Sequence, residues 1–215
     1  MAAIYPSLIS ADLLNLEHVL HELNPHVPGY HLDIMDSHFV PNLTWGPAFI
    51  DAIARKTHRQ LWVHLMVTNP LPWCEILQLP ANSIFSFHVE SEGNIARIIK
   101  KIKEKKWIPS ITINPQTAIE KVLPSLEILN HVLLMSVEPG FSGQEFIPST
   151  VEKLKRLNGY RQTSGLTFTI GIDGGINKNN IKNLTDAGAN HIAAASAIFN
   201  DNNIIDSFKE LKEAL

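Results

Sequence analysis

Three apolar runs of the sequence end in side chains that could bind a metal ion. The segment HLDIMD, residues 31–36, places His31 and Asp33 on one face of a strand, because strand side chains alternate with a period of two. His64 and Asp173 end two further runs, in HLM and IDGG. Taken alone, His31 and Asp33 fit a hydrogen-bonded core pair. Two imidazoles and two carboxylates together favour a site for Zn²⁺, Mn²⁺, Fe²⁺ or Co²⁺.

Glycine-rich turns follow the ends of other apolar runs and indicate an anion site. The loop EPGFSGQ, residues 138–144, follows one run, and paired glycines follow Asp173 directly. Glycine lets a backbone approach a ligand closely, and helix N-termini attract anions. An ordinary tight turn is the alternative for each loop taken singly. The candidate phosphate contacts are Gly140, Ser142, Gly143, Gly174, Gly175 and Ser196.

Alternating strand and helix patterns provide the frame that would bring these residues together. Eight strand-helix units in 215 residues predict one α/β domain over residues 1–215, a (β/α)8 or TIM barrel. The alternative is a doubly wound open sheet, which concentrates its site at one switch point rather than at many strand ends. The expected strands are 4–9, 30–35, 61–67, 84–89, 109–113, 131–137, 168–172 and 191–195. The expected helices are 13–23, 47–56, 72–79, 94–105, 118–123, 148–161, 178–187 and 203–214, with Asn94 and Asn177 as N-caps.

Composition excludes several classes of protein. The 18 Lys and Arg residues against 21 Asp and Glu residues leave a net charge of -3, without the basic excess that nucleic acid binding requires. No apolar run approaches a membrane span of about 18 residues, and the N-terminus lacks a basic targeting segment. Cys74, the single cysteine, is expected to be a buried thiol. We therefore expect a cytoplasmic protein that binds neither nucleic acid nor membranes.

Five ordered motifs resemble the ribulose-phosphate 3-epimerase family. The match runs from the first expected strand to the end of the eighth, which is essentially the whole chain. It implies a metal-dependent isomerase of the pentose phosphate pathway that interconverts D-ribulose 5-phosphate and D-xylulose 5-phosphate as a homo-oligomer, a dimer or hexamer. The motifs are PSLISAD at 6–12, HLDIMDSHFVPNLTWGP at 31–47, HLMV at 64–67, MSVEPGFSGQEFI at 135–147 and IDGGIN at 172–177.

The same resemblance implies roles for individual residues. One divalent metal ion per chain, with Zn²⁺ favoured, would be held by His31, Asp33, His64 and Asp173. Asp33 and Asp173 would also be the catalytic acid and base. Ser7 and His64 would lie beside the substrate, and Met35, Met66 and Met135 would shield the enediolate. The remaining substrate contacts, mostly to its phosphate, would be Gly140, Phe141, Ser142, Gly143, Gly174, Gly175, Ala195 and Ser196.

Three residues depart from the family pattern. Ser37 replaces the glycine usual in the D-G-H-F run, and Ser142 replaces the middle glycine of G-F-G-G. Ala195 stands where Gly-Ser is common and adds a methyl group where the backbone would approach phosphate. None of the three is a candidate metal ligand, so we expect effects on substrate affinity or preference rather than on the type of reaction.

The chemistry of epimerisation agrees with these residue types. A proton next to a ketone is weakly acidic, so the enediolate needs a Lewis acid and a desolvated site. Inversion needs proton removal on one face and return on the other. The strands that carry Asp33 and Asp173 are three apart in a ring of eight, so the two carboxylates can flank one substrate.

Other residues and functions remain as alternatives. The parity of Asp36 turns it away from Asp33 and favours a loop-stabilising role. The remaining histidines are interpreted as surface or structural residues, and His88, two residues before Glu90, is the exception to watch. A six-carbon ketose phosphate such as allulose 6-phosphate would suit the same residues. A catalytically silent metal-binding barrel is a further alternative. A Schiff-base aldolase would need a strand lysine, which none of the expected strands contains.

Overall fold

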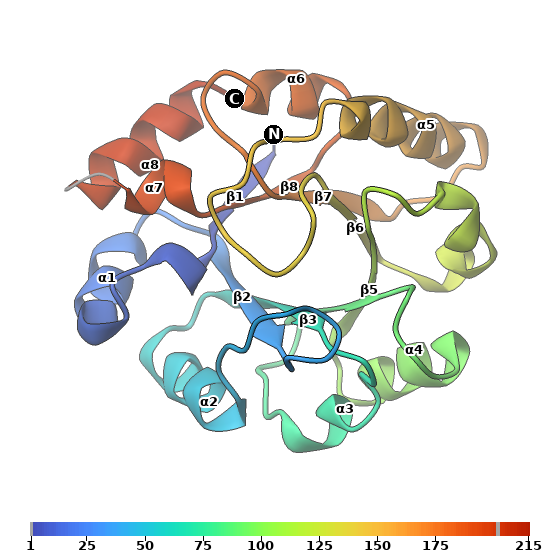
Figure 1. Ribbon diagram of the computed structural model, residues 1–215, viewed down its shortest axis with the longest axis horizontal. Coiled ribbons are helices and arrows are strands. Elements are labelled where there is room, and N and C mark those ends of the chain that lie inside the picture. The colour runs from blue at the N-terminus through green and yellow to red at the C-terminus, as the bar shows by residue number, and fades with distance from the viewer. Residues whose placement is uncertain (1, 201–202) are drawn as a thin grey trace.

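The computed structural model describes residues 2–200 and 203–215 and forms a (β/α)8 barrel, as predicted. Eight parallel strands run in the order β1-β8-β7-β6-β5-β4-β3-β2, and a bridge between Ser7 and His31 links the first strand to the second. Figure 1 shows the strands as a central ring with the helices outside. The strands are β1 Ala3–Pro6, β2 Gly29–Met35, β3 Gln60–Met66, β4 Ile84–His88, β5 Ile108–Ile113, β6 His131–Met135, β7 Thr169–Asp173 and β8 His191–Ala194.

The helices around the ring follow the expected alternation, with differences at four points. The strand expected over 4–9 gives way to a 3-10 turn, η1 Leu8–Ser10, and the helix expected over 13–23 starts with another, η2 Leu13–Asn15. The short helix α7, Ser196–Phe199, was not expected, and the fourth difference lies between β5 and β6. Between β5 and β6, where a helix was expected over 118–123, the chain forms two 3-10 turns, η3 Ile119–Lys121 and η4 Leu123–Ile128. Pro124 explains the difference, because proline lacks the N–H group and crowds the preceding turn of an α-helix. The α-helices are α1 Leu16–Leu23, α2 Pro47–Lys56, α3 Trp73–Ile76, α4 Ile95–Glu104, α5 Ser149–Thr163, α6 Ile181–Asp186, α7 Ser196–Phe199 and α8 Ile204–Glu213.

The two expected N-caps have different outcomes. Asn94 caps α4 as predicted, since its side chain accepts the N–H of Arg97. Asn177 was the wrong choice for α6, which begins after Asn180. The side chain of Asn177 instead accepts the N–H of Asn179 in the turn before the helix. The run of asparagines at this point offers several caps, and local turn geometry selects among them.

Alternation along the strands separates the site from the main core. In β2, Leu32 and Ile34 point outward into the large hydrophobic cluster beneath the helices. Asp33 and Met35 lie on the opposite face, inside the barrel, where both line a pocket. The period of two predicted from the sequence is therefore confirmed for this strand, and its chemically active face is the lumen.

Trp62 of β3 fills the barrel beneath the site. Its side chain is fully buried, and its Nε1–H donates a hydrogen bond of 2.8 Å to Ser86 Oγ. The ring of His31 packs edge-to-face on Trp62, with 4.8 Å between the ring centroids. Gly171 of β7 leaves room for the indole, because a β-carbon there would lie 2.6 Å from it. This floor supports His31 from below.

Two expectations from composition can be compared with the structure. Cys74 is fully buried, and burial raises the pKa of its thiol to about 12, which keeps it protonated and unreactive. Within residues 2–200 and 203–215, no helix is long and apolar enough to cross a membrane.

The histidines of the barrel floor predict a dependence of stability on pH. His191 stacks on His131 at 5.1 Å, and burial lowers the pKa of His191 to about 4. Between about pH 6.5 and pH 4 the unfolded chain binds a proton at this residue that the folded chain excludes, so stability falls as the pH falls. The variant His191→Phe keeps a ring without the titrating group. Urea unfolding at pH 7.5 and pH 5 should show a smaller loss for this variant than for wild type, and an equal loss would contradict the assignment.

Candidate active site

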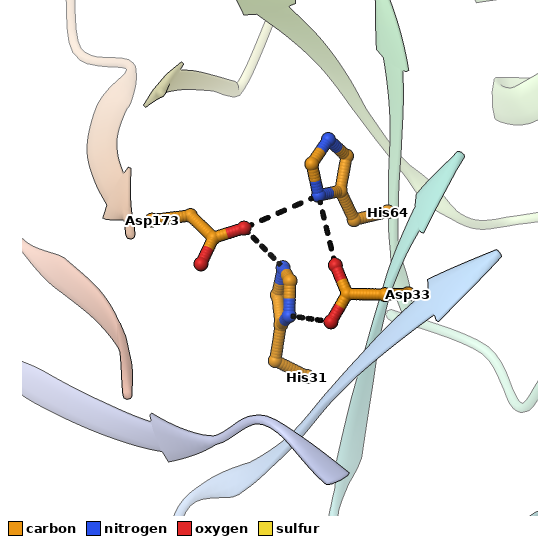
Figure 2. Close-up of side chains that lie close together, drawn as sticks. All are labelled: His31, Asp33, His64 and Asp173. Carbon is orange, nitrogen blue, oxygen red and sulfur yellow. Dashed lines mark hydrogen bonds and ion pairs between the residues drawn. The ribbon is translucent and has the colours of Figure 1, made fainter. Parts of the chain in front are cut away.

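Four side chains from three strands converge at the carboxyl end of the barrel (Figure 2). His64 Nδ1 lies 3.2 Å from Asp33 Oδ1 and 3.3 Å from Asp173 Oδ2. His31 Nδ1 lies 3.2 Å from Asp33 Oδ2, and its Nε2 lies 3.8 Å from Asp173 Oδ2. One candidate ligand atom from each residue falls within 4.8 Å of the others. The structure thus brings the four predicted metal ligands together.

The charges in this cluster stabilise one another. Burial alone would raise the pKa of Asp33, but the charges of His31 and His64 and the hydrogen bond to His64 hold it well below its usual range. Burial alone would lower the pKa of His64, but hydrogen bonds and charges of Asp173 and Asp33 raise it to about 9. The buried carboxylate of Asp33 therefore requires positive charge beside it, from imidazolium or from a metal cation.

The donor set fits a divalent metal ion. Neither ring nitrogen of His31 makes a hydrogen bond, although the residue is fully buried. A buried imidazole with two unbonded nitrogens is costly in a protein core and is explained when one of them is a metal ligand. Imidazole nitrogens combined with carboxylate oxygens suit Zn²⁺, Mn²⁺, Fe²⁺ and Co²⁺. His31, Asp33, His64 and Asp173 could therefore hold such an ion.

Neighbouring side chains hold Asp33 in place. Ser7 Oγ–H donates a hydrogen bond of 2.7 Å to Asp33 Oδ2. The carbonyl of Asp33 accepts a bond of 2.7 Å from Thr44 Oγ1, which itself accepts the N–H of Met35 at 2.9 Å. Ser7 directly follows β1 and bridges to His31 of β2 where the ring of strands closes. Asp33 of β2 is therefore also held by a residue next to β1. Its carboxylate has one defined orientation.

A pocket that is open to solvent lies directly above the cluster, with about 510 Å³ of space not filled by protein atoms, solvent at its mouth included. His31 and His64 lie beneath it, fully buried. Most predicted site residues line it: Ser7, Asp33, Met35, Met66, Met135, Gly140, Phe141, Ser142, Gly143, Asp173, Gly174, Gly175, Ala195 and Ser196. Sequence reasoning missed seven lining residues: Ile9, Val137, Glu138, Pro139, Gln144, Ile176 and Ala193. Ile9 lies in a 3-10 turn, Leu8–Ser10, after the end of β1, so the alternation of the strand expected over 4–9 does not extend to it.

The glycines beside the pocket are required by close packing. Gly174 has a φ of +114°, and a β-carbon there would collide with the side chain of Val137. Gly175 has a φ of +63°, and its β-carbon would lie 2.6 Å from the backbone nitrogen of Phe146. Both φ values lie in the region that favours glycine. The loops after β6 and β7 can therefore pack together at the pocket wall only because both residues lack side chains.

Side chains also join the other loops around the mouth. Gln144 Nε2 donates to the carbonyl oxygens of Glu138 and Phe141 at 2.6 and 2.9 Å, which closes the loop after β6 on itself. Asn42 Nδ2 donates to the carbonyl oxygen of Gly140 at 2.7 Å and links this loop to the one after β2. The pocket rim is thus a connected network.

Asp36 stabilises the loop after β2, as its parity predicted. Its Oδ1 accepts the N–H groups of His38 and Phe39 at 2.9 and 2.8 Å, and its Oδ2 accepts that of Thr68 at 2.8 Å. Burial opposes the charge, but these backbone hydrogen bonds lower the pKa of Asp36. Ser37 follows with a φ of +60°, a conformation that a side chain makes unfavourable.

His88 lies closer to the site than its sequence position suggested. It is buried at the end of β4, and its Nε2 lies 2.9 Å from His64 Nε2. Its Nδ1 lies 3.3 Å from Glu90 Oε2. Burial outweighs the nearby Glu90 and lowers the pKa of His88 to about 4, so the ring is neutral at neutral pH. The spacing of His88 and Glu90 was the only sequence signal for this contact.

Comparison with known proteins identifies the family. A sequence model of the ribulose-phosphate 3-epimerase family matches residues 3–199. The chain belongs to the ribulose-phosphate 3-epimerase family. It is therefore an enzyme of the isomerase class. It is 40% identical over 203 residues to "Ribulose-phosphate 3-epimerase, cytoplasmic isoform" of Oryza sativa subsp. japonica, which covers 92% of this chain and 87% of the rice protein. It is 33% identical to the ribulose-phosphate 3-epimerase of Bacillus subtilis strain 168, with 99% of both chains covered.

Solved structures of other proteins share the fold of this epimerase family member. The crystal structure of 3-hexulose-6-phosphate synthase matches with a TM-score of 0.71 at 13% identity and covers 99% of both chains. The structure of KGPDC from Streptococcus mutans has the same TM-score at 9% identity, covering 100% of this chain and 97% of the other. At such low identity the likeness concerns the barrel alone.

The positive φ of Ser37 predicts a measurable backbone strain at this residue. Glycine adopts a φ of +60° without the clash that a β-carbon causes, so Ser37→Gly should raise the free energy of unfolding by about 0.5–1 kcal/mol. Ser37→Ala is the matched control, because it keeps the β-carbon and should be no more stable than wild type. Urea unfolding measures both. A glycine variant no more stable than the alanine variant would rule out strain at Ser37.

Proposed function

We propose that this enzyme interconverts D-ribulose 5-phosphate and D-xylulose 5-phosphate by inverting the configuration at C3. The observation that carries the proposal is the placement of Asp33 and Asp173, which line one pocket from strands β2 and β7. The two strands are separated by β1 and β8, so the carboxylates approach the pocket from different sides. The names of the rice and Bacillus subtilis relatives support the same reaction.

His31, Asp33, His64 and Asp173 would hold one divalent metal ion, with Zn²⁺ favoured and Mn²⁺, Fe²⁺ or Co²⁺ as alternatives. When bound, the ion would supply Lewis-acid stabilisation of the negative charge that develops on the substrate oxygens. The cluster is suited to this task because His31 and His64 are fully buried and Asp33 is almost fully buried. Water therefore competes little for its donor atoms.

Asp33 and Asp173 would move the proton. One carboxylate removes the C3 proton of the substrate, and the other returns a proton to the opposite face, which inverts the carbon. Ser7 holds Asp33 through its Oδ2, so this base meets the substrate in a fixed orientation. Met35, Met66 and Met135 line the pocket as buried apolar side chains and would exclude water from the enediolate.

The loops on the far side of the pocket would bind the phosphate group. Glycines let the backbone approach the phosphate, and no lysine or arginine lines the described pocket, so the binding would rely on N–H groups and hydroxyls. Ala195 would place its methyl group in this cradle. The proposed contacts are Gly140, Phe141, Ser142, Gly143, Gly174, Gly175, Ala195 and Ser196.

The enzyme would work in the cytoplasm as a homo-oligomer, a dimer or hexamer. The name of the rice relative as a cytoplasmic isoform supports the location. Leu14 and Leu43 support an oligomer, since both are large apolar side chains with exposures of 101% and 69%. Light scattering of the purified protein should give a mass of two or six chains, each of 24.0 kDa. A mass of one chain at micromolar concentration would contradict the oligomer.

Replacing either carboxylate tests the proposed reaction. Wild type should contain a divalent metal and epimerise D-ribulose 5-phosphate, and in D2O it should introduce deuterium at C3. Asp33→Asn and Asp173→Asn should each lose epimerisation by several orders of magnitude, because one base is missing. The comparison requires variants with restored metal, verified by elemental analysis, since metal loss would mimic base loss.

Two results would contradict the proposal. Near-normal inversion by either metal-replete variant would exclude the two-carboxylate mechanism. A wild-type protein that epimerises allulose 6-phosphate but not D-ribulose 5-phosphate would keep the reaction type and exclude the proposed substrate.

A further inference from the structure

One ring nitrogen of His64 faces a buried imidazole outside the metal cluster, that of His88. His64 directs Nδ1 toward Asp33 and Asp173 and turns Nε2 away from them, toward His88. The rings of His64 and His88 stack with 5.0 Å between centroids and an interplanar angle of 22°. Both residues are buried, so water cannot replace this contact. Whether His88 presents a hydrogen-bond donor or an acceptor to His64 Nε2 therefore determines whether Nε2 carries a proton.

Glu90 determines whether His88 presents a donor or an acceptor to His64. Its Oε2 faces His88 Nδ1 at 3.3 Å, and its Oε1 accepts the backbone N–H of Asn114 at 3.0 Å. Burial would raise the pKa of Glu90, but hydrogen bonds from His88, Thr117 and Asn114 lower it, so the group is a carboxylate. A carboxylate can only accept hydrogen bonds, so His88 must carry its proton on Nδ1. With this proton on Nδ1, His88 presents the lone pair of Nε2 to His64.

The hydrogen between the two Nε2 atoms must therefore belong to His64. The 2.9 Å separation admits one hydrogen, and His88 has none to give there. Without a metal ion, His64 Nδ1 can also carry a proton and donate it to the carboxylates of Asp33 and Asp173. A metal ion would replace that proton and leave the one on Nε2 in place. In a neutral His64 ring, this tautomer is the one that can bind a metal through Nδ1.

We propose that Glu90 and His88 are positioning residues that hold His64 in the tautomer and orientation in which its Nδ1 binds the metal ion. This inference rests on the metal site of the proposed function and extends it to residues outside the pocket. Hydrogen bonds run from His64 Nε2–H to His88 Nε2 and from His88 Nδ1–H to Glu90. The negative charge of Glu90 makes His64 a stronger donor toward the ion.

Variants of the two residues separate this role from simple packing. His88→Phe keeps a ring between His64 and Phe39 but removes the acceptor, whereas His88→Gln restores an acceptor oxygen. Glu90→Gln keeps the shape and removes the charge. The matched control is Glu92→Gln, which removes the same charge from an exposed side chain of the same loop. The measurement is the dissociation constant for Zn²⁺, obtained by competition with a chelator, together with the melting temperature of each metal-free protein.

The proposal predicts an ordered series of affinities. His88→Phe and Glu90→Gln should each weaken Zn²⁺ binding by about 10–100-fold. His88→Gln should weaken it less than His88→Phe, and Glu92→Gln should bind as wild type does. ¹⁵N NMR of the Zn²⁺-loaded wild type should show His64 protonated at Nε2. This last measurement needs no variant, so it decides the tautomer even if His88→Phe fails to fold.

Several results would overturn the proposal. Affinities of His88→Phe and Glu90→Gln within twofold of wild type would do so, even with lowered melting temperatures, because packing alone would then explain both residues. His64 without a proton on Nε2 would do the same. A wild type that binds Zn²⁺ no more tightly than His64→Ala would remove the metal site itself, and the proposed function with it. Tight wild-type binding with unaffected variants would remove only the role of His88 and Glu90.

Discussion

The burial of Asp33 beside two imidazoles, with the partly exposed Asp173 facing the same imidazoles, is the constraint on which the rest of this structure depends. Asp33 is 4% exposed and His64 is fully buried, so neither can rely on water to stabilise its charge. Leaving one partner of a buried ion pair uncompensated costs about 3–5 kcal/mol. The strands that carry these residues must therefore meet in one register. The barrel achieves this by pairing Asp33 directly with His64 across β2 and β3 and by bridging Ser7 to His31 at the seam.

The layers above and below the cluster follow from the same constraint. Below it, Trp62 fills the lumen and supports His31. The indole of Trp62 in turn requires a glycine at position 171. Above it, three methionines cover the site while leaving a pocket open. Thioether side chains can fit irregular space without adding polar groups that would compete for the donors. The polar layer is therefore enclosed by apolar groups on both sides and reached only through the pocket.

The barrel and most of the site could be predicted because they depend on alternation along the chain. A period of two placed His31 and Asp33 on one face, and strand-helix repetition placed that face near Asp173. The direction of that face, toward the lumen or toward the helices, follows only from ring closure. The contact of His88 with His64 depends on the register between β3 and β4, which no local pattern encodes. The loss of the helix at 118–123 came from Pro124, a single residue whose effect outweighed the helical spacing around it.

The site is divided between strands and loops, and the three residues that differ from the expected family pattern all fall on the loop side of this division. The candidate metal ligands lie on strands, whose pairing holds them within a narrow range of positions. Ser37, Ser142 and Ala195 all lie outside the strands, in the segments after β2, β6 and β8. Binding energy from a phosphate remote from the reacting carbon is nearly equal in the ground state and the transition state. Under the proposed function, changes in these segments would therefore alter substrate affinity, while the loss of a strand ligand would impair the reaction itself.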